Sequence, residues 1–303
     1  MCIRDSSYPL HAGRVDGDRI VCGYHGFEYG ADGRCAWIPS LQMASPNIRV
    51  QAYPTKEVGP FIWLWTGDPD AVDESRFIDQ PWFYEPGWRW VNGYFHMKAN
   101  YLGLHENLFD TSHFPFLHGA VLGRPDHAVE QPQVKRGEDN VVTLEILHRD
   151  VPVARRMLDQ SVSGLARPIN RLSQGRVEGP AMHVGTVTYM SAANPTQSFI
   201  TMVIHATTPE SQGVTHYYWA TSRNIALEDE IVQADSYKTA YTAFEQDKVA
   251  LEEIEAMTSR DKRPDFRERI IATDRGSVQI LRAMAQRAAE EDATRAAEHQ
   301  AAE

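Results

Sequence analysis

The residues best able to do chemistry in this sequence lie between positions 105 and 118. Asp110, His113 and His118 recur there at intervals of three and five residues. On a helix, three residues bring Asp110 and His113 to neighbouring faces, whereas five would separate the two histidines. Pro115 lies between the histidines and predicts that the helix ends or bends there. His118 could then turn back toward His113. Two converging imidazoles form a metal chelate that lacks an anionic ligand, although solvated histidines at a helix end are the simpler interpretation.

The missing ligand is predicted far along the chain, on a long helix. Apolar residues at roughly the 3.6-residue period predict this helix over about 228–257. Asp247 follows Phe244 by three residues and so lies on or near the apolar face, where a carboxylate is costly unless it is paired or bound to a cation. Two histidines and one carboxylate on one face of a metal are the ligands of non-haem Fe(II) oxygenases, and they leave positions for O2. Zinc would accept the same ligands, and Asp247 alone would be interpreted as a solvated helix carboxylate.

A second pair of candidate ligands lies in a hairpin predicted over residues 19–37. Cys22 and His25 have C-x-x-H spacing in the tight loop between two strands. Gly23 and Gly26 would let the backbone approach a buried inorganic centre, because a glycine has no Cβ. A thiolate paired with an imidazole suits zinc or one iron of a mixed-ligand iron–sulfur cluster.

The loop Cys-Gly-Tyr-His-Gly-Phe-Glu-Tyr at residues 22–29 resembles the second ligand loop of a Rieske [2Fe–2S] domain. This resemblance implies a first loop, C-x-H, at positions 3 and 5, where the sequence has Ile3 and Asp5. Cys2 is one position out of register. Because the cluster needs two thiolates and two imidazoles, we expect that this chain does not assemble a complete one. We hypothesise that residues 1–6 are a foreign or mis-assembled start of a truncated gene; the competing hypothesis is a natural protein that has lost its cluster.

The pattern Asn107-x-x-Asp110-x-x-His113-x4-His118, with a distant Glu-x-Asp-Lys around Asp247, resembles the catalytic domain of Rieske non-haem iron oxygenases. Within that family the similarity is to vanillate O-demethylase and dicamba-type monooxygenases, and it covers nearly the whole chain. It implies that His113, His118 and Asp247 hold a mononuclear Fe(II), with Asn107 close to the metal. It also implies a head-to-tail homotrimer, in which Asp110 bridges to a cluster histidine of the neighbouring subunit.

The chain is long enough for two domains, and its patterns differ on the two sides of an acidic, turn-rich stretch. Residues 1–83 are predicted to form an all-β Rieske domain, truncated at its start. Residues 84–303 are predicted to form the catalytic mononuclear iron domain. Strand-like stretches at 141–148, 183–190, 199–207 and 214–221, followed by a long helix, indicate an α+β, helix-grip fold with a curved antiparallel sheet.

The composition limits the partners. A formal net charge of -11 disfavours nucleic acid and anionic membranes, and it leaves room for a basic protein partner. No apolar run approaches the ~18 residues of a membrane span. Three cysteines make a poor disulfide framework and fit a reducing compartment, so the cytoplasm is expected. No Gly-x-Gly-x-x-Gly fingerprint is present, so NAD(P)H is expected to bind a separate flavin- or ferredoxin-type reductase that supplies electrons.

The resemblance implies the oxygenase component of a multicomponent aromatic monooxygenase, which uses O2 and reductase-supplied electrons to oxidise an aromatic carboxylate. O-demethylation of a methoxybenzoate is the leading case. We expect mononuclear iron binding to survive the missing cluster ligands and reductase-driven turnover to be weak or absent. The alternatives are a ring-hydroxylating dioxygenase, a non-catalytic helix-grip module that binds an apolar ligand, and a zinc hydrolase.

The substrate pocket is expected between the sheet and the long helix. The strand residues His205, His216 and Trp219 are candidates to line it, although packing on the sheet explains each of them equally well. Arg155 or Arg167 could pair with a substrate carboxylate, but exposure to solvent is the simpler interpretation of both arginines.

Overall fold

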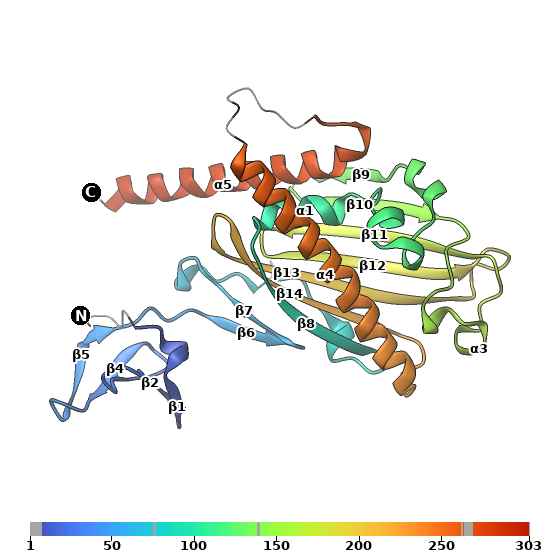
Figure 1. Cartoon of the computed structure of the whole chain (residues 1–303). Coiled ribbons are helices and arrows are strands. Elements are labelled where there is room, and N and C mark those ends of the chain that lie inside the picture. The colour runs from blue at the N-terminus through green and yellow to red at the C-terminus, as the bar shows by residue number, and fades with distance from the viewer. Residues whose placement is uncertain (1–7, 75–76, 138–139, 262, 264–268, 303) are drawn as a thin grey trace. The chain divides into compact units, whose positions relative to one another are not determined.

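The structure is a computed structural model that describes residues 8–74, 77–137, 140–261, 263 and 269–302 (Figure 1). The chain forms two compact units, Met1–Asp79 and Gln80–Glu303. The sequence placed this boundary after residue 83. The first cluster loop expected near Ile3 and Asp5 lies outside the described residues. None of the described helices combines the length and the apolar character needed to cross a membrane.

The first unit is a small β domain. Strands β1 to β5 form one antiparallel sheet in sequence order, and β6 pairs with β7 in a separate hairpin. The strands β2, β3 and β4 confirm the hairpin predicted over residues 19–37. A small core contains Cys22, Tyr29, Cys35 and Ile38. The strands are β1 (Arg14–Asp16), β2 (Arg19–Val21), β3 (Glu28–Tyr29), β4 (Arg34–Ile38), β5 (Met43–Arg49), β6 (Thr55–Val58) and β7 (Phe61–Leu64).

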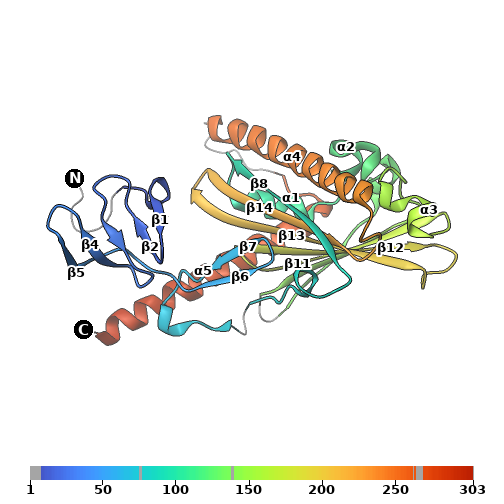
Figure 2. The same ribbon diagram turned by 90° about the horizontal axis from the view of Figure 1, so that it is seen from below.

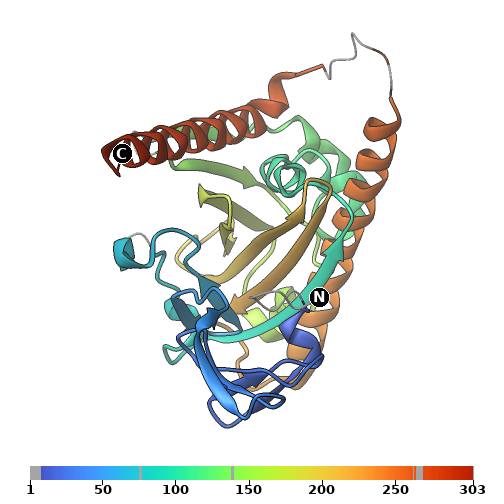
Figure 3. The same cartoon turned by 90° about the vertical axis from the view of Figure 1, so that its left-hand side faces the viewer.

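The second unit contains a seven-stranded antiparallel sheet in the order β8-β14-β13-β12-β11-β10-β9. Four of these strands were predicted from the sequence, and β8, β9 and β11 were not. Its strands curve in the view of Figure 3, as the helix-grip prediction requires. They are β8 (Arg89–Met97), β9 (Gln133–Arg136), β10 (Val142–His148), β11 (Ile169–Gly179), β12 (Met182–Ser191), β13 (Ser198–Ser211) and β14 (Val214–Arg223).

Helix α4 lies across one face of this sheet (Figures 1 and 2). The five α-helices of the described residues are α1 (Tyr101–Phe109), α2 (Phe114–Leu117), α3 (Gln160–Ser163), α4 (Glu230–Arg260) and α5 (Arg275–Ala302). Residues on the helix-covered face of β8 and β14, including Phe95, Tyr217 and Trp219, are buried against Ala240 of α4. Gly93 is required here, because a Cβ at this position would lie 2.2 Å from the Trp219 indole.

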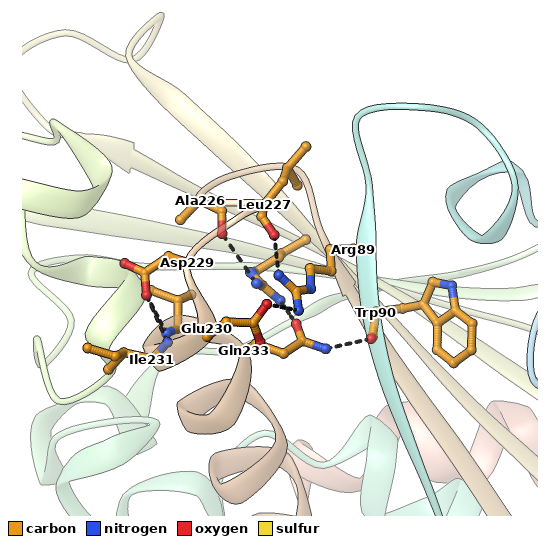
Figure 4. A network of polar contacts seen from close by, with 10 residues as sticks. Arg89, Trp90, Ala226, Leu227, Asp229, Glu230, Ile231 and Gln233 are labelled. Atoms are coloured by element: carbon orange, nitrogen blue, oxygen red, sulfur yellow. Dashed lines mark hydrogen bonds and ion pairs between the residues drawn. The ribbon is translucent and has the colours of Figure 1, made fainter.

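A polar network fixes the start of α4 to the sheet (Figure 4). The Asp229 carboxylate accepts hydrogen bonds of 2.9 and 3.0 Å from backbone N–H groups of the first helical turn. On β8, Arg89 forms a 2.7 Å ion pair with Glu230, and the Gln233 amide donates a 3.0 Å hydrogen bond to the Trp90 carbonyl. These bonds hold the helix against the sheet edge from which it runs toward the candidate site.

Candidate metal centre and substrate cavity

The turn that bends the chain between the candidate ligands begins at Asp110, so the predicted role of Pro115 is wrong. α1 ends at Phe109, and Asp110 already has an extended backbone. The Asp110 carboxylate accepts hydrogen bonds from the Ser112 backbone N–H (2.8 Å) and hydroxyl (2.6 Å). Such bonds between side chain and backbone compete with the helix. Pro115 instead lies in the first turn of α2, where a missing N–H is tolerated.

Helix α2 then places the two histidines. His113 directly precedes this four-residue helix and His118 directly follows it. Their rings lie 5.1 Å apart, centroid to centroid, with an interplanar angle of 71°. The convergence of the two imidazoles predicted from the sequence is therefore present, but a single helical turn produces it rather than a proline kink.

Asp247 completes the cluster from the middle of α4. Its Oδ1 atom lies 3.4 Å from His113 Nε2 and 3.3 Å from His118 Nε2. The residue is 3% exposed. The structure thus brings together His113, His118 and Asp247, the three ligands selected from the sequence, although more than 130 positions separate His113 from Asp247.

The gap between these atoms fits a metal ion. Ligand bonds of about 2.1 Å that subtend roughly 105° would separate the ligand atoms by about 3.3 Å. One ligand atom from each of His113, His118 and Asp247 lies within 4.8 Å of the others. Both ring nitrogens of His113 are buried without a hydrogen-bond partner among the described residues. An imidazole with two unsatisfied nitrogens beside a buried carboxylate is a donor set that fits a divalent cation.

Electrostatics tie the carboxylates and His113 together. Burial opposes the protonation of His113, but Asp110 and Asp247 outweigh it and raise the pKa of His113 to about 9. Burial would raise the pKa of Asp247, yet its contacts with His113 and His118 hold that pKa well below the usual range. Asp110 Oδ2 lies 3.8 Å from His113 Nδ1, which is an ion-pair distance and too long for a hydrogen bond. A metal ion must therefore displace a proton from this cluster.

Two further residues hold the candidate ligands in place. The Gln246 side-chain oxygen accepts a 3.0 Å hydrogen bond from His118 Nδ1, which leaves the Nε2 lone pair directed at the gap. The Asn107 amide donates a 3.2 Å hydrogen bond to Asp247 Oδ1. Asn107 was selected from the sequence, whereas Gln246 was not. The one sequence signal that could have indicated Gln246 is its position next to Asp247. No hydrophobic periodicity or motif marks Gln246 itself.

A cavity of about 160 Å³ opens beside the cluster. His113, His118 and Asp247 line it, together with residues of α4 and of strands β10 to β14. His205 lines it as the sequence suggested, and so does Arg155. His216, Trp219 and Arg167 do not belong to its lining. Trp219 is in the core under α4, and Arg167 is exposed.

Two histidines in the cavity wall are electrically neutral. Burial lowers the pKa of His205 to about 3, and it lowers the pKa of His183 well below its usual value, with a further contribution from His205. The Tyr217 hydroxyl lies 2.7 Å from His205 Nδ1, and His183 Nδ1 has no hydrogen-bond partner among the described residues. The wall of the cavity therefore offers uncharged hydrogen-bonding groups beside the metal-ligand cluster.

Family comparisons agree with this architecture. Residues 97–290 match the vanillate O-demethylase oxygenase C-terminal domain, and residues 4–54 match the Rieske [2Fe-2S] domain. The first match alone spans more than half of the chain. This chain belongs to the vanillate O-demethylase oxygenase family.

Curated relatives of this family member are similar over most of their length. The vanillate O-demethylase oxygenase subunit of a Pseudomonas species is 30% identical over 81% of this chain and 77% of the relative. The toluene-4-sulfonate monooxygenase system iron-sulfur subunit of Comamonas testosteroni is 29% identical over 84% of this chain and 75% of the relative. The dicamba O-demethylase oxygenase component of Stenotrophomonas maltophilia is 25% identical over 90% of this chain and 81% of the relative.

The fold is that of dicamba monooxygenase. Its crystal structure with dicamba superposes with a TM-score of 0.82 and 23% sequence identity, covering 94% of this chain and 84% of that one. The predictions of a Rieske-type oxygenase component and of a β domain followed by a helix-grip domain are confirmed. The family assignment disfavours the non-catalytic binding module.

Rieske domains carry a [2Fe–2S] cluster, and the described residues of this family member supply part of a site for one. Cys22 and His25 lie in the loop between β2 and β3, with Cys22 buried and His25 exposed. The Cys22 backbone N–H donates a 2.8 Å hydrogen bond to the Phe27 carbonyl, which closes this loop. A full set of two cysteines and two histidines is not present in the sequence at the expected spacing, because Ile3 and Asp5 occupy the other two positions. The residues present therefore do not fit a complete cluster.

A second cluster with metal-ligand chemistry lies on the sheet, at exposed positions. His96 and His216 face each other on β8 and β14, and Glu210 Oε2 lies 2.6 Å from His96 Nε2 and 3.4 Å from His216 Nε2. His216, which the sequence suggested for the pocket, belongs to this cluster. Any measurement of metal content must separate it from the buried site.

Proposed function

We propose that this chain uses O2 and electrons from a partner reductase to oxidise an aromatic carboxylate, with O-demethylation of a methoxybenzoate as the leading reaction. The observation that carries this proposal is the buried cluster in which two histidine Nε2 atoms surround one oxygen of Asp247 beside a closed-in cavity. Relatives named vanillate O-demethylase and dicamba O-demethylase support the type of reaction.

In this proposal His113, His118 and Asp247 hold Fe(II). When bound, the iron supplies the capacity to bind and reduce O2 next to the substrate. Gln246 fixes the tautomer of His118 by accepting the Nδ1 proton, and Asn107 holds the carboxylate of Asp247 by donating to it. Apolar side chains and the neutral histidines His183 and His205 form the part of the cavity wall that would lie against the substrate ring.

We assign residues 1–83 to the Rieske domain and residues 84–303 to catalysis. The proposed electron source is a flavin- or ferredoxin-type reductase that oxidises NAD(P)H, and the proposed assembly is a cytoplasmic homotrimer. Asp110 is the residue proposed to face a neighbouring subunit. Its side chain is 30% exposed, and one of its oxygens lies toward His113. A carboxylate at ion-pair distance from His113 and partly open to solvent can bind a histidine of a neighbouring subunit on its other side.

The test measures metal content and O2 consumption separately. Protein loaded anaerobically with Fe(II) should retain one iron per chain, and Asp247→Ala should abolish this iron. The double variant His96→Ala/His216→Ala is the matched control, because it removes the exposed cluster and should leave the buried iron in place. Iron lost from the control but kept in Asp247→Ala would contradict the assignment.

O2 consumption is then followed with a methoxybenzoate and an artificial reductant. We expect consumption and release of formaldehyde to depend on Asp247. With a reductase as electron source, turnover should be weak in the chain as written, and the variant Ile3→Cys/Asp5→His should restore it. A normal Rieske visible and EPR spectrum from the unmodified chain would refute the cluster-deficiency prediction. Hydrolytic activity with zinc and without O2 would favour the zinc hydrolase instead.

A further inference from the structure

The cavity beside the candidate iron site holds more positive charge than its own residues neutralise. Arg155 and Arg171 both line it, and Asp247 is the one carboxylate among its described lining residues. That carboxylate already faces the two histidines of the metal cluster. The remaining histidines of the wall, His183 and His205, are neutral because they are buried. The two guanidinium groups are therefore the cavity's uncompensated charges.

Arg171 is the more deeply placed of the two arginines. It is 4% exposed, and a buried charge is costly unless it is paired. Its hydrogen bonds go to neutral acceptors, the Leu122 carbonyl (2.5 Å, Nη1) and His148 Nδ1 (3.1 Å, Nη2). Among the described residues, its Nε has no hydrogen-bond partner and no carboxylate lies within ion-pair distance of it. Glu130 attracts it only from farther away.

Arg155 is half-buried, and it too has no ion-pair partner among the described residues. Its guanidinium donates a 3.2 Å hydrogen bond to the Tyr189 hydroxyl, and its Nε is buried without a partner among the described residues. Arg155 and Arg171 repel each other, which adds to the energy of holding both inside the protein. Two like charges with unsatisfied donors, kept next to a cavity, form a site that suits an anion.

This site lies one aromatic ring away from the metal cluster. The Arg171 guanidinium lies over the Phe114 ring at 5.4 Å from its centroid. The Phe114 ring in turn lies 4.9 Å from the His113 ring and 5.7 Å from the His118 ring. A substituted benzene bound alongside Phe114 would then have one end at the guanidinium groups and the other at the metal.

We propose that Arg155 and Arg171 bind the anionic group of the substrate, a carboxylate or a sulfonate, and so direct the opposite end of its ring to the metal. The substrate class is thus an aromatic monoanion, and a neutral aromatic compound of the same shape is a poor ligand. This inference deepens the proposed function and rests on substrates binding in this cavity. A bidentate guanidinium suits either anion, so the choice between carboxylate and sulfonate falls to experiment.

The test is a binding measurement that needs neither cluster nor turnover. The full chain is loaded with redox-inert Zn(II), and calorimetry measures the affinity of benzoate, benzenesulfonate and uncharged benzamide. We expect at least one anion to bind about tenfold or more tightly than benzamide, because hydrogen bonds between two charged groups are stronger than those to a neutral amide. The tighter of the two anions identifies the anion class. Equal affinity for benzamide and both anions would overturn the proposal.

Variants separate a binding role from a structural one. Arg155→Gln should weaken binding of the preferred anion about tenfold and leave benzamide binding unchanged. Arg171→Lys keeps the charge in the buried position and should weaken anion binding less than Arg171→Gln. Arg156→Gln is the matched control, because the neighbouring Arg156 pairs with Asp159 and does not line this cavity. An equal loss for benzamide and the anion in Arg155→Gln would mean a structural role and refute the proposal.

Failure of this inference and failure of the proposed function are distinguishable. Selective anion binding to the zinc-loaded protein, with no oxygenation by the iron-loaded protein under the artificial reductant, would refute the proposed oxidation and leave the anion site standing. Oxygenation of benzamide-type and benzoate-type substrates with equal KM would refute the anion site and leave the oxygenase function standing.

Discussion

Removing the hydrogen-bond acceptor of His118 should weaken metal binding without unfolding the protein. In Gln246→Leu the Nδ1 proton of His118 loses its partner, which lies 3.0 Å away in the structure. With metal on Nε2 this proton must stay on Nδ1, buried and unpaired. Without metal the ring can change tautomer and donate from Nε2 to Asp247, 3.3 Å away. The penalty therefore falls on the metal-bound state alone, and it reduces affinity rather than stability.

The size of the effect follows from the cost of an unpaired buried donor. About 1–3 kcal/mol corresponds to roughly a 5- to 150-fold loss of affinity, in line with the 10- to 100-fold typical of such outer partners. A competition titration of Zn(II) against a chromophoric chelator measures it. Gln246→Glu keeps an acceptor and should bind at least as tightly as the unmodified chain. Glu245→Gln, at the exposed neighbouring position, is the control.

Unchanged zinc affinity in Gln246→Leu would refute the reasoning, because it would mean that His118 does not bind metal through Nε2. A fall in thermal stability of the metal-free protein equal to the loss of affinity would refute it as well. In that case the hydrogen bond would stabilise the fold in both states.

Three further predictions concern the proton on His113, the proposed bridging role of Asp110 and the packing around Gly93. Because the pKa of His113 is raised to about 9, a proton on His113 competes with the metal ion below that pH. The apparent zinc affinity should therefore rise by about tenfold per pH unit from pH 7 and level off above pH 9. A zinc affinity that does not change with pH would contradict this. Asp110→Asn, made in the variant with both missing cluster ligands restored, should keep its iron and lose about 10- to 100-fold in reductase-driven turnover, and loss of iron would mean that Asp110 is a ligand. Gly93→Ala should lower the free energy of unfolding, measured in urea, by about 1–3 kcal/mol, because the added Cβ would overlap Trp219. Gly103→Ala is the control. Its added Cβ would lie 3.6 Å from the Leu251 side chain, an ordinary contact, so this variant should not be destabilised.

The residues of the buried cluster could be selected from the sequence because each carries a local signal. The 3.6-residue period of the long helix places Asp247 near an apolar face, where a carboxylate needs a partner. The convergence of His113 and His118 was predicted from Pro115 between them, because their spacing alone would separate them on a helix. The predicted cause of that convergence was wrong, because Pro115 lies inside the single turn of α2 that places both histidines. The preceding helix ends earlier, at Phe109, where the Asp110 side chain binds Ser112, and this competition between two hydrogen-bonding patterns cannot be seen in the sequence.

The two arginines and Gln246 show what local signals cannot supply. An arginine in an isolated sequence is most simply interpreted as exposed, and this was the interpretation of Arg155. Arg171 lies on β11, which was not predicted as a strand. Its burial follows from the register that pairs it with His148 across the sheet, a contact between distant positions. The pairing of β13 with β14 and of β14 with β8 likewise puts His205 on the cavity side and His216 on the other face, although the two residues have similar strand surroundings in the sequence.

The rotation of α4 about its own axis decides whether the site exists. Asp247 is 17 residues beyond Glu230, where the network at the helix start is anchored, so about 25 Å of helix separates the two points. Each residue turns the helix by about 100°, and a slip of one position would carry the carboxylate away from the histidines. The start of the helix is too far away to set this angle. Phe244, one turn before Asp247, packs edge-on against His205 at 4.8 Å and Trp219 at 5.2 Å, and so fixes the rotation locally. The aromatic core under α4 therefore also positions the third candidate ligand.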